Sequence, residues 1–203
     1  VDWFLTRILL YVILKMNFHP EFVDNFDFDT KSNIEVIVNN VKFSLKLHEN
    51  ISNQFFNKKQ FELFLFHFFK TIQSLPKVHK SQVNIVFYDI PYEKYVPTKK
   101  SFVEPKHINS AYCYVSSSEN ETNIVIYRRE EFYKVLIHEM IHLFKIVPFD
   151  DKLQTKYQQM FSSVANTINV NEALVELNAI YINCQILAKT QNESVQSLLE
   201  EEY

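Results

Sequence analysis

The sequence predicts an α+β domain in which strands and helices follow one another along most of the chain. Two short runs of alternating apolar and polar residues, one continuous apolar run and several helical patterns indicate this class. With 203 residues, 47% of them hydrophobic, the chain is long enough to bury a core as one domain over 1–203. We expect an apolar helix and linker over 1–32, a sheet with a backing helix over 33–129, and two long helices within 130–203.

The first expected element is the strongly apolar stretch 3–16. It is shorter than the roughly 20 residues needed to span a bilayer, and Arg7 interrupts it. We therefore expect a core or interface helix. A membrane anchor or the remnant of a signal sequence is the alternative, and the protein would then be tethered to a membrane.

The sheet is expected to begin with a β-hairpin formed by the alternating runs 34–37 and 41–47. The chain contains no glycine, so a turn that needs positive φ must use another residue, and Asn39-Asn40 lies between the two runs. A helix rich in phenylalanine is expected over 57–75, and its single histidine, His67, is expected to pack in the core.

The second half of the sheet is expected to contain an apolar strand at 83–88 and a strand pair at 110–115 and 124–127. The polar residues 116–122 are expected to join that pair as a loop. A helix over about 130–145 follows, with acidic residues at its start and a lysine at its end, as the helix dipole favours. This helix is apolar on most faces, so we expect it to be buried.

The same helix contains the pattern H-E-x-x-H as His138-Glu139-Met140-Ile141-His142. Residues four apart lie on one face of a helix, so both imidazoles can bind one metal ion. Glu139 can then act as the general base on a water molecule whose pKa the metal lowers from about 15.7 towards roughly 7. A catalytic zinc site also needs a third protein ligand.

A second polar pair, Glu172 and Glu176, lies four residues apart in the N-E-x-x-x-E pattern of a predicted downstream helix. Together the two patterns resemble the gluzincin metallopeptidases, the thermolysin-like group. This resemblance implies one Zn²⁺ per chain, with Glu172 as the third ligand after His138 and His142. It also implies that Glu176 hydrogen-bonds the outer nitrogen of a ligand histidine.

The order of elements over about 33–190 resembles the catalytic part of zincin peptidases. That family has a mixed twisted sheet with a backing helix, an active-site helix and a C-terminal glutamate helix. Its strand before the active-site helix is a sheet edge that binds extended peptide. The resemblance therefore implies a peptide or protein substrate held along Ser110, Ala111 and Tyr112, although an ordinary sheet strand would look the same.

The activity that the resemblance implies is hydrolysis of peptide bonds by a metal-activated water, with Glu139 as the base. Other zinc families fit less well, because a metzincin needs glycine and histidine where the chain has Lys145 and Pro148. Two alternatives stay open. In the first, H-E-x-x-H is a coincidence in a core helix. In the second, the metal stabilises an inactive zincin fold that has a binding or structural role. The second gains support because thermolysin-like enzymes use a later histidine for the oxyanion, and none follows His142.

The charge of the chain argues against two classes of partner. A net charge of -3 and the absence of a basic run give no general attraction to nucleic acid or to an anionic membrane.

The two cysteines suggest no disulfide framework. The bias towards Asn, Lys, Ile, Phe and Tyr resembles proteins of AT-rich genomes, including those of large DNA viruses. We expect an intracellular location, cytoplasmic or virion-associated.

Overall fold

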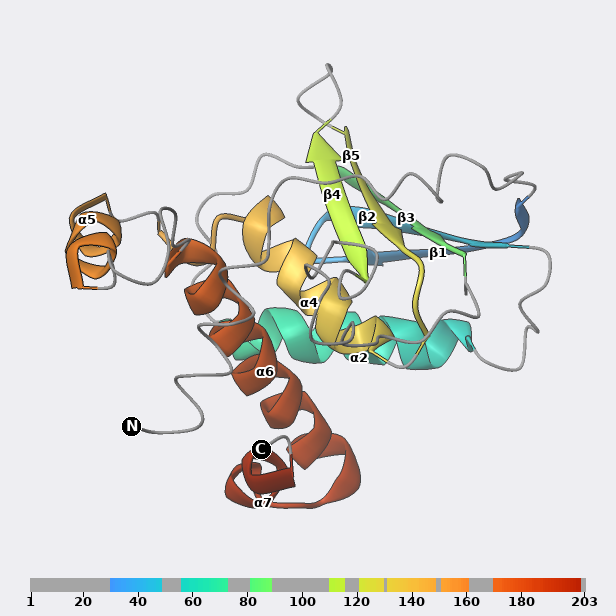
Figure 1. Ribbon diagram of the computed structural model, residues 1–203. Helices are drawn as coiled ribbons and strands as arrows, with labels where there is room; N and C mark the ends of the chain where they lie inside the picture. Colours follow the sequence, from blue (N-terminus) through green and yellow to red (C-terminus); the bar gives the residue numbers. More distant parts are fainter. Residues whose placement is uncertain are drawn as a thin grey trace, which may run out of the picture.

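The computed structural model describes eight stretches of the chain: 30–48, 56–72, 81–88, 110–115, 121–129, 131–148, 151–160 and 170–201. In these stretches a mixed sheet is combined with helices, as the sequence predicts (Figure 1). The apolar segment 3–16 lies outside them. None of the helices in these stretches is long and apolar enough to cross a bilayer.

The sheet has five strands in the order β1-β2-β3-β5-β4. β1 (Thr30–Val38) and β2 (Val41–His48) are antiparallel, and β2 runs parallel to β3 (Gln82–Phe87). β3 is also parallel to β5 (Glu121–Ile126). β4 (Ala111–Val115) pairs antiparallel with β5 and forms one edge of the sheet among the described strands.

The predicted hairpin between β1 and β2 is confirmed. Asn39 and Asn40 have φ angles of 51° and 64° and connect the paired residues Val38 and Val41. A two-residue hairpin turn with positive φ at both positions is the type that matches the twist of the strands. Asparagine tolerates this conformation better than other non-glycine residues, so the turn forms in a chain without glycine.

One face of the sheet supplies much of the hydrophobic core. Matching rows of β2, β3 and β5 bury the apolar residues Phe43, Leu45, Leu47, Val83, Ile85, Phe87, Ile124 and Ile126. Polar residues alternate with them, and on the opposite face the Nδ2 atom of Asn84 donates a hydrogen bond to Oδ1 of Asn123, at 3.2 Å. The described helices that contact the sheet therefore pack on its apolar face.

The prediction of a polar loop over 116–122 is wrong at its end, because β5 begins at Glu121 and not at Ile124. Its first residues pair with β3, Glu121 with Gln82 and Thr122 with Val83. Thr122 is fully buried. Polar side chains made this segment look like a loop, but the parallel pairing to a distant strand extends it.

Helix α2 (Lys58–Thr71) backs the sheet. The helix was predicted to begin at Asn57, and it begins one residue later: the side chain of Asn57 accepts a hydrogen bond from the Lys59 amide and caps the helix. Apolar residues repeat along its inner face: Phe61, Phe64, Leu65, Phe68 and Phe69 are all buried. The helix ends at Thr71, earlier than predicted, and 73–75 lie outside the described residues.

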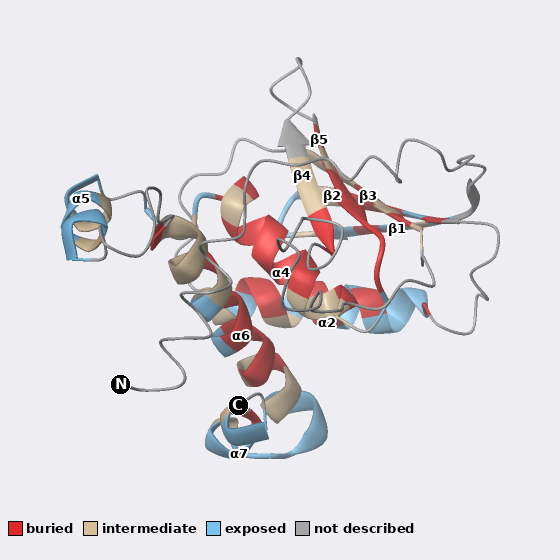
Figure 2. Ribbon diagram, viewed as in Figure 1, coloured by how far each residue is buried: buried red, intermediate tan, exposed pale blue. Residues whose placement is uncertain are grey.

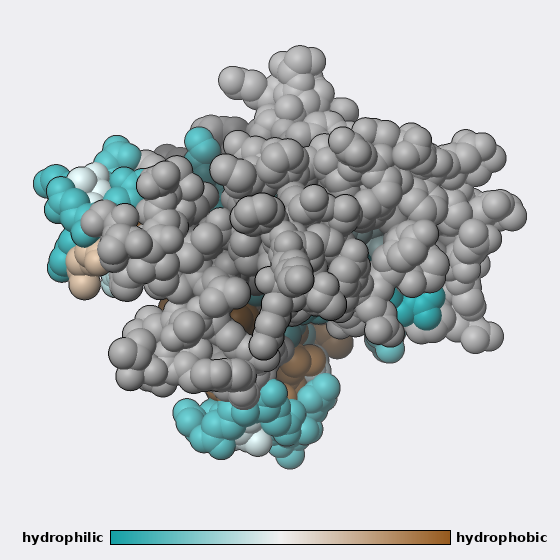
Figure 3. All heavy atoms as spheres, in the orientation of Figure 1, coloured by the Kyte–Doolittle hydropathy of each residue, from teal (hydrophilic) through white to brown (hydrophobic). Residues whose placement is uncertain are grey.

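Helix α4 (Phe132–Leu143) lies between the sheet and helix α6 (Val170–Gln191). It contacts β4 and β5 on one side and α6 on the other, and most of its residues are buried (Figure 2). One hydrophobic core joins the sheet, α2, α4 and α6. The sequence patterns missed α5 (Asp151–Met160) and α7 (Val195–Glu201), whose surfaces are mainly hydrophilic (Figure 3).

Helix α4 is shorter at both ends than the predicted 130–145. Glu131 is its N-cap residue, and Lys145 follows its end with a φ of 50°. The Lys145 amide donates to the His142 carbonyl, and the Ile146 amide donates to the Ile141 carbonyl. This pair of bonds is a Schellman motif, which usually places glycine where Lys145 stands. The helix therefore ends just beyond His142.

Candidate metal centre

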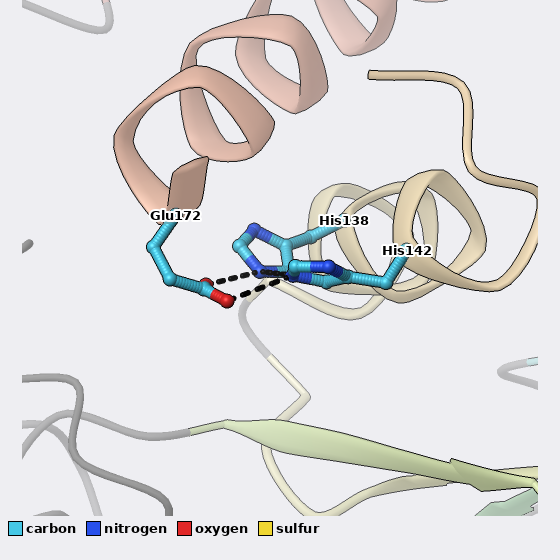
Figure 4. Close-up of side chains that lie close together, drawn as sticks. All are labelled: His138, His142 and Glu172. Carbon is cyan, nitrogen blue, oxygen red and sulfur yellow. Dashed lines mark hydrogen bonds and ion pairs between the residues drawn. The ribbon is translucent and has the colours of Figure 1, made fainter. Parts of the chain in front are cut away.

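The two histidines of H-E-x-x-H face the first turn of α6 (Figure 4). The Nε2 atom of His138 is 3.4 Å from Oε2 of Glu172, and Nε2 of His142 is 3.2 Å from Oε1 of the same carboxylate. The two Nε2 atoms are 3.2 Å apart. Two helices that are distant in the sequence therefore bring two imidazole nitrogens and the two oxygens of one carboxylate close together.

This arrangement fits a bound metal ion. The ligand atoms of His138, His142 and Glu172 all lie within 4.8 Å of one another. In a tetrahedral site with bonds of about 2.0–2.1 Å, two donor atoms are about 3.3 Å apart. The two Nε2 atoms are 3.2 Å apart, and each lies 3.2–3.4 Å from a different oxygen of Glu172, so each of these separations is close to that spacing. Two imidazoles and a carboxylate are also donors that divalent transition metals accept.

Glu176 determines which nitrogen of His138 faces this group. Its Oε2 atom lies 2.8 Å from Nδ1 of His138. An ionised carboxylate only accepts hydrogen bonds, so Nδ1 is the donor. The lone pair of Nε2 is then directed at Glu172 and His142. The structure thus brings Glu176, one helical turn after Glu172, to the outer nitrogen of a candidate ligand.

The two histidines differ in exposure. The side chain of His138 is 4% exposed, whereas that of His142 is 29% exposed. The group is therefore buried on the side of His138 and open to solvent on the side of His142.

Glu139 is buried, with 4% of its surface exposed. Within the described residues, no hydrogen bond or ion pair occupies its carboxylate. A buried carboxylate without such partners costs free energy, so an ionised side chain at this position destabilises the fold. Burial raises the pKa of the nearby Tyr127 hydroxyl; the charge of Arg128 opposes this rise and that of Glu139 adds to it.

The predicted substrate strand lies at the sheet edge as β4. Ser110, just before it, and Ala111 are buried, while Tyr112 is half-buried. The Ser110 carbonyl accepts a hydrogen bond from the Tyr127 amide at the end of β5. Backbone groups alternate in direction along an antiparallel pair, so those of Ser110 and Tyr112 face β5 and those of Ala111 point away from it.

Two charged residues of the centre were missed by the sequence patterns. The Lys134 ammonium lies 2.8 Å from Oε1 of Glu131 and 3.9 Å from Oε1 of Glu176. The spacing could have indicated Lys134, because this residue lies four residues before His138 and therefore on the same face of α4. Nothing in the sequence indicated that Glu176 would lie opposite.

His67 lies on α2 and is half-buried, in keeping with the packing role expected of it. Burial lowers its pKa, and the charges of Lys189 and Lys70 lower it further. Cys113 and Cys184 form no disulfide.

No family model matches the chain, and neither a curated protein nor a solved structure matches it. The geometry of the site is therefore the basis for its function.

Proposed function

We propose that the protein is a zinc metallopeptidase of the gluzincin type, with zinc held by His138, His142 and Glu172. The observation that supports this most is the meeting of Glu172 with both Nε2 atoms of H-E-x-x-H, within 3.4 Å. A coincidental H-E-x-x-H in a core helix has no reason to face a carboxylate from another helix. The N-E-x-x-x-E pattern supplies that carboxylate at the position which the gluzincin resemblance implies.

The number of ligands favours a catalytic site over a structural one. Structural zinc is closed by four protein ligands, while catalytic zinc has three and an open position. In the described part of the chain the group has three members, and it is open beside His142. Zinc bound by such a set supplies a Lewis acid that activates water for attack on a carbonyl group.

Glu139 is the general base in this proposal. Its carboxylate accepts a proton from the attacking water, whose oxygen forms a bond to the peptide carbonyl carbon. The same carboxyl group then donates the proton to the leaving nitrogen as the carbon–nitrogen bond breaks. The burial of Glu139 and the absence of hydrogen bonds or ion pairs to it within the described residues support this role.

A zincin-like architecture is part of the proposal. Helix α4 lies beneath β4 and β5, and α6 packs on its other side, so an extended peptide along the edge strand would lie near the candidate metal centre. The Ala111 backbone, which points away from β5, is the group best directed to bind it.

The decisive experiment compares zinc content and peptidase activity in the wild type, Glu139→Gln, Glu172→Gln and a control, Glu62→Gln, at an exposed position of α2. We expect about one zinc per chain in the wild type and in Glu139→Gln, and much less in Glu172→Gln. On a mixture of fluorogenic peptides, Glu139→Gln should lower kcat/KM about 100- to 10,000-fold. Glu62→Gln should match the wild type in both measurements.

Each other result points to a specific alternative. If the wild type contains zinc but cleaves no peptide, the protein is an inactive metal-binding protein with a binding or structural role. A wild type that takes up no zinc, even after incubation with the metal, means that H-E-x-x-H is a coincidence. Full activity in Glu139→Gln would refute the assigned base.

A further inference from the structure

We propose that Lys134 is a positioning residue of the metal centre, which holds Glu176 in the orientation that directs His138. This inference rests on the proposed metal site and adds a residue to it. In this proposal Lys134 is neither a metal ligand nor a reacting group. It acts through Glu176, and Glu131 holds it in place.

The two oxygens of Glu176 have different partners. Oε2 lies 2.8 Å from Nδ1 of His138, and Oε1 lies 3.9 Å from the Lys134 ammonium. The first contact is a hydrogen bond, and the second is an ion pair at longer range. A carboxylate restrained at both oxygens has a fixed plane, whereas one bonded only through Oε2 can rotate about its last side-chain bond. Lys134 therefore limits the movement of the group that orients His138.

A second carboxylate, that of Glu131, holds Lys134 in place. Its ammonium lies 2.8 Å from Oε1 of Glu131, the N-cap residue of α4. The Ser110 hydroxyl donates to the second oxygen of Glu131, at 3.4 Å. A continuous series of polar contacts thus runs from the start of the edge strand, through Glu131, Lys134 and Glu176, to His138.

The helical spacing explains why these residues meet. Glu131, Lys134 and His138 lie three and then four residues apart, on one face of α4. On α6, Glu172 lies opposite His142 and His138, and Glu176 lies opposite His138 and Lys134. The contacts advance along α6 as they go back along α4, so the two helices meet in antiparallel directions. One turn of α4 before His138 is therefore the place that faces Glu176.

The ion pairs of Lys134 with Glu176 and Glu131 are more buried than ordinary surface ion pairs. The side chains of Lys134, Glu176 and Glu131 are 16%, 13% and 24% exposed. Exposed pairs of this kind contribute little, because water screens them and both side chains lose freedom. Here the lysine faces two partly buried carboxylates, and its removal would leave them beside each other without that charge.

The test uses Lys134→Met, which keeps most of the side-chain length and removes the charge, and Lys134→Arg, which keeps the charge. Lys59→Met, at an exposed position of α2, is the matched control. Zinc affinity is measured by competition with a chromogenic chelator, and the ligand geometry by the visible absorption spectrum of the Co²⁺-loaded protein. We expect Lys134→Met to bind zinc about tenfold more weakly and to change the cobalt spectrum, within the range for partners of metal-binding histidines. Lys134→Arg should recover most of the affinity.

Wild-type affinity and an unchanged cobalt spectrum in Lys134→Met would overturn the proposal. So would a Lys134→Arg variant that folds but binds zinc no better than Lys134→Met. If Lys134→Met does not fold without metal, Glu131→Gln gives the same test, because it weakens the anchor of the lysine, and a severalfold loss of affinity is expected. A wild type that binds zinc without peptidase activity refutes the proposed function and leaves this inference standing. A wild type that binds no zinc refutes both.

Discussion

The Nδ1 atom of His138 lies 2.8 Å from Oε2 of Glu176, across the interface between α4 and α6. This contact does two things at once. It orients the imidazole so that Nε2 points at Glu172, and it links the two helices that contribute the candidate ligands. The packing of α6 on α4 and the ligand geometry therefore depend on each other.

Removing this contact should weaken metal binding without removing a ligand. We expect Glu176→Ala to lower zinc affinity about 10- to 100-fold, because His138 loses the acceptor that fixes its tautomer and orientation. The measurement is a chelator competition on the purified variant, beside Glu62→Ala at an exposed position of α2. Equal affinities in Glu176→Ala and the wild type would show that the helices alone hold the imidazole in place.

Much of this centre could be predicted from the sequence because its decisive spacings are local. His138 and His142 are four apart, as are Glu172 and Glu176, and a helix alone places each pair on one face. That the two faces meet followed only from the resemblance to gluzincins, since nothing in either pattern specifies the packing of α6 on α4.

The errors arose where distant pairings decide the structure. The start of β5 at Glu121 depends on pairing with Gln82 and Val83 of β3, which is invisible in the local pattern. The partnership of Lys134 with Glu176 likewise depends on how two helices pack. Helix α5 was missed because its residues are polar and none is buried, so it lacks the apolar repeat that identifies a helix.

Helix α5 should nevertheless affect the candidate metal centre through Gln154. Its Oε1 atom accepts a hydrogen bond from the Val170 amide, at 2.9 Å, in the first turn of α6 and two residues before Glu172. This amide has no partner within its own helix, so Gln154 acts as a cap supplied from elsewhere in the chain. We expect Gln154→Ala to lower the free energy of unfolding by about 1 kcal/mol and to weaken zinc binding severalfold.

Urea unfolding and chelator competition measure the two effects of Gln154→Ala. Gln158→Ala is the matched control, because Gln158 lies on the same helix and its side chain is exposed. If Gln154→Ala lowers stability but leaves zinc affinity unchanged, the start of α6 keeps Glu172 in place without this bond.

The end of α4 offers a stabilising substitution. Lys145 has a φ of 50°, a conformation that costs a non-glycine residue free energy. We expect Lys145→Gly to raise the free energy of unfolding by about 0.5–1 kcal/mol, because glycine is the residue that the Schellman motif favours. Glu62→Gly, inside α2, should instead lower it by about 1 kcal/mol. A decrease in stability for Lys145→Gly in urea unfolding would contradict the assigned helix end.

The alkaline stability of the protein should depend on Tyr127. Burial raises the pKa of this hydroxyl above its ordinary value of about 10, and the charge of Glu139 adds to the effect although Arg128 opposes it. The unfolded chain therefore loses this proton at lower pH than the folded protein does. The stability that the protonated hydroxyl contributes is complete below pH of about 10 and declines as the pH rises beyond it, by up to about 1.4 kcal/mol per pH unit.

Tyr127→Phe removes this titration, so its free energy of unfolding should fall less steeply than that of the wild type above pH of about 10. Lysines and the remaining tyrosines titrate in both proteins, and the difference between the two curves isolates Tyr127. Urea unfolding at several pH values between about 8 and 11 measures it, with Tyr181→Phe, at a half-exposed position, as the control. Parallel curves for Tyr127→Phe and the wild type would mean that the folded protein releases the Tyr127 proton as readily as the unfolded chain. Tyr127 would then be in contact with water in the folded protein.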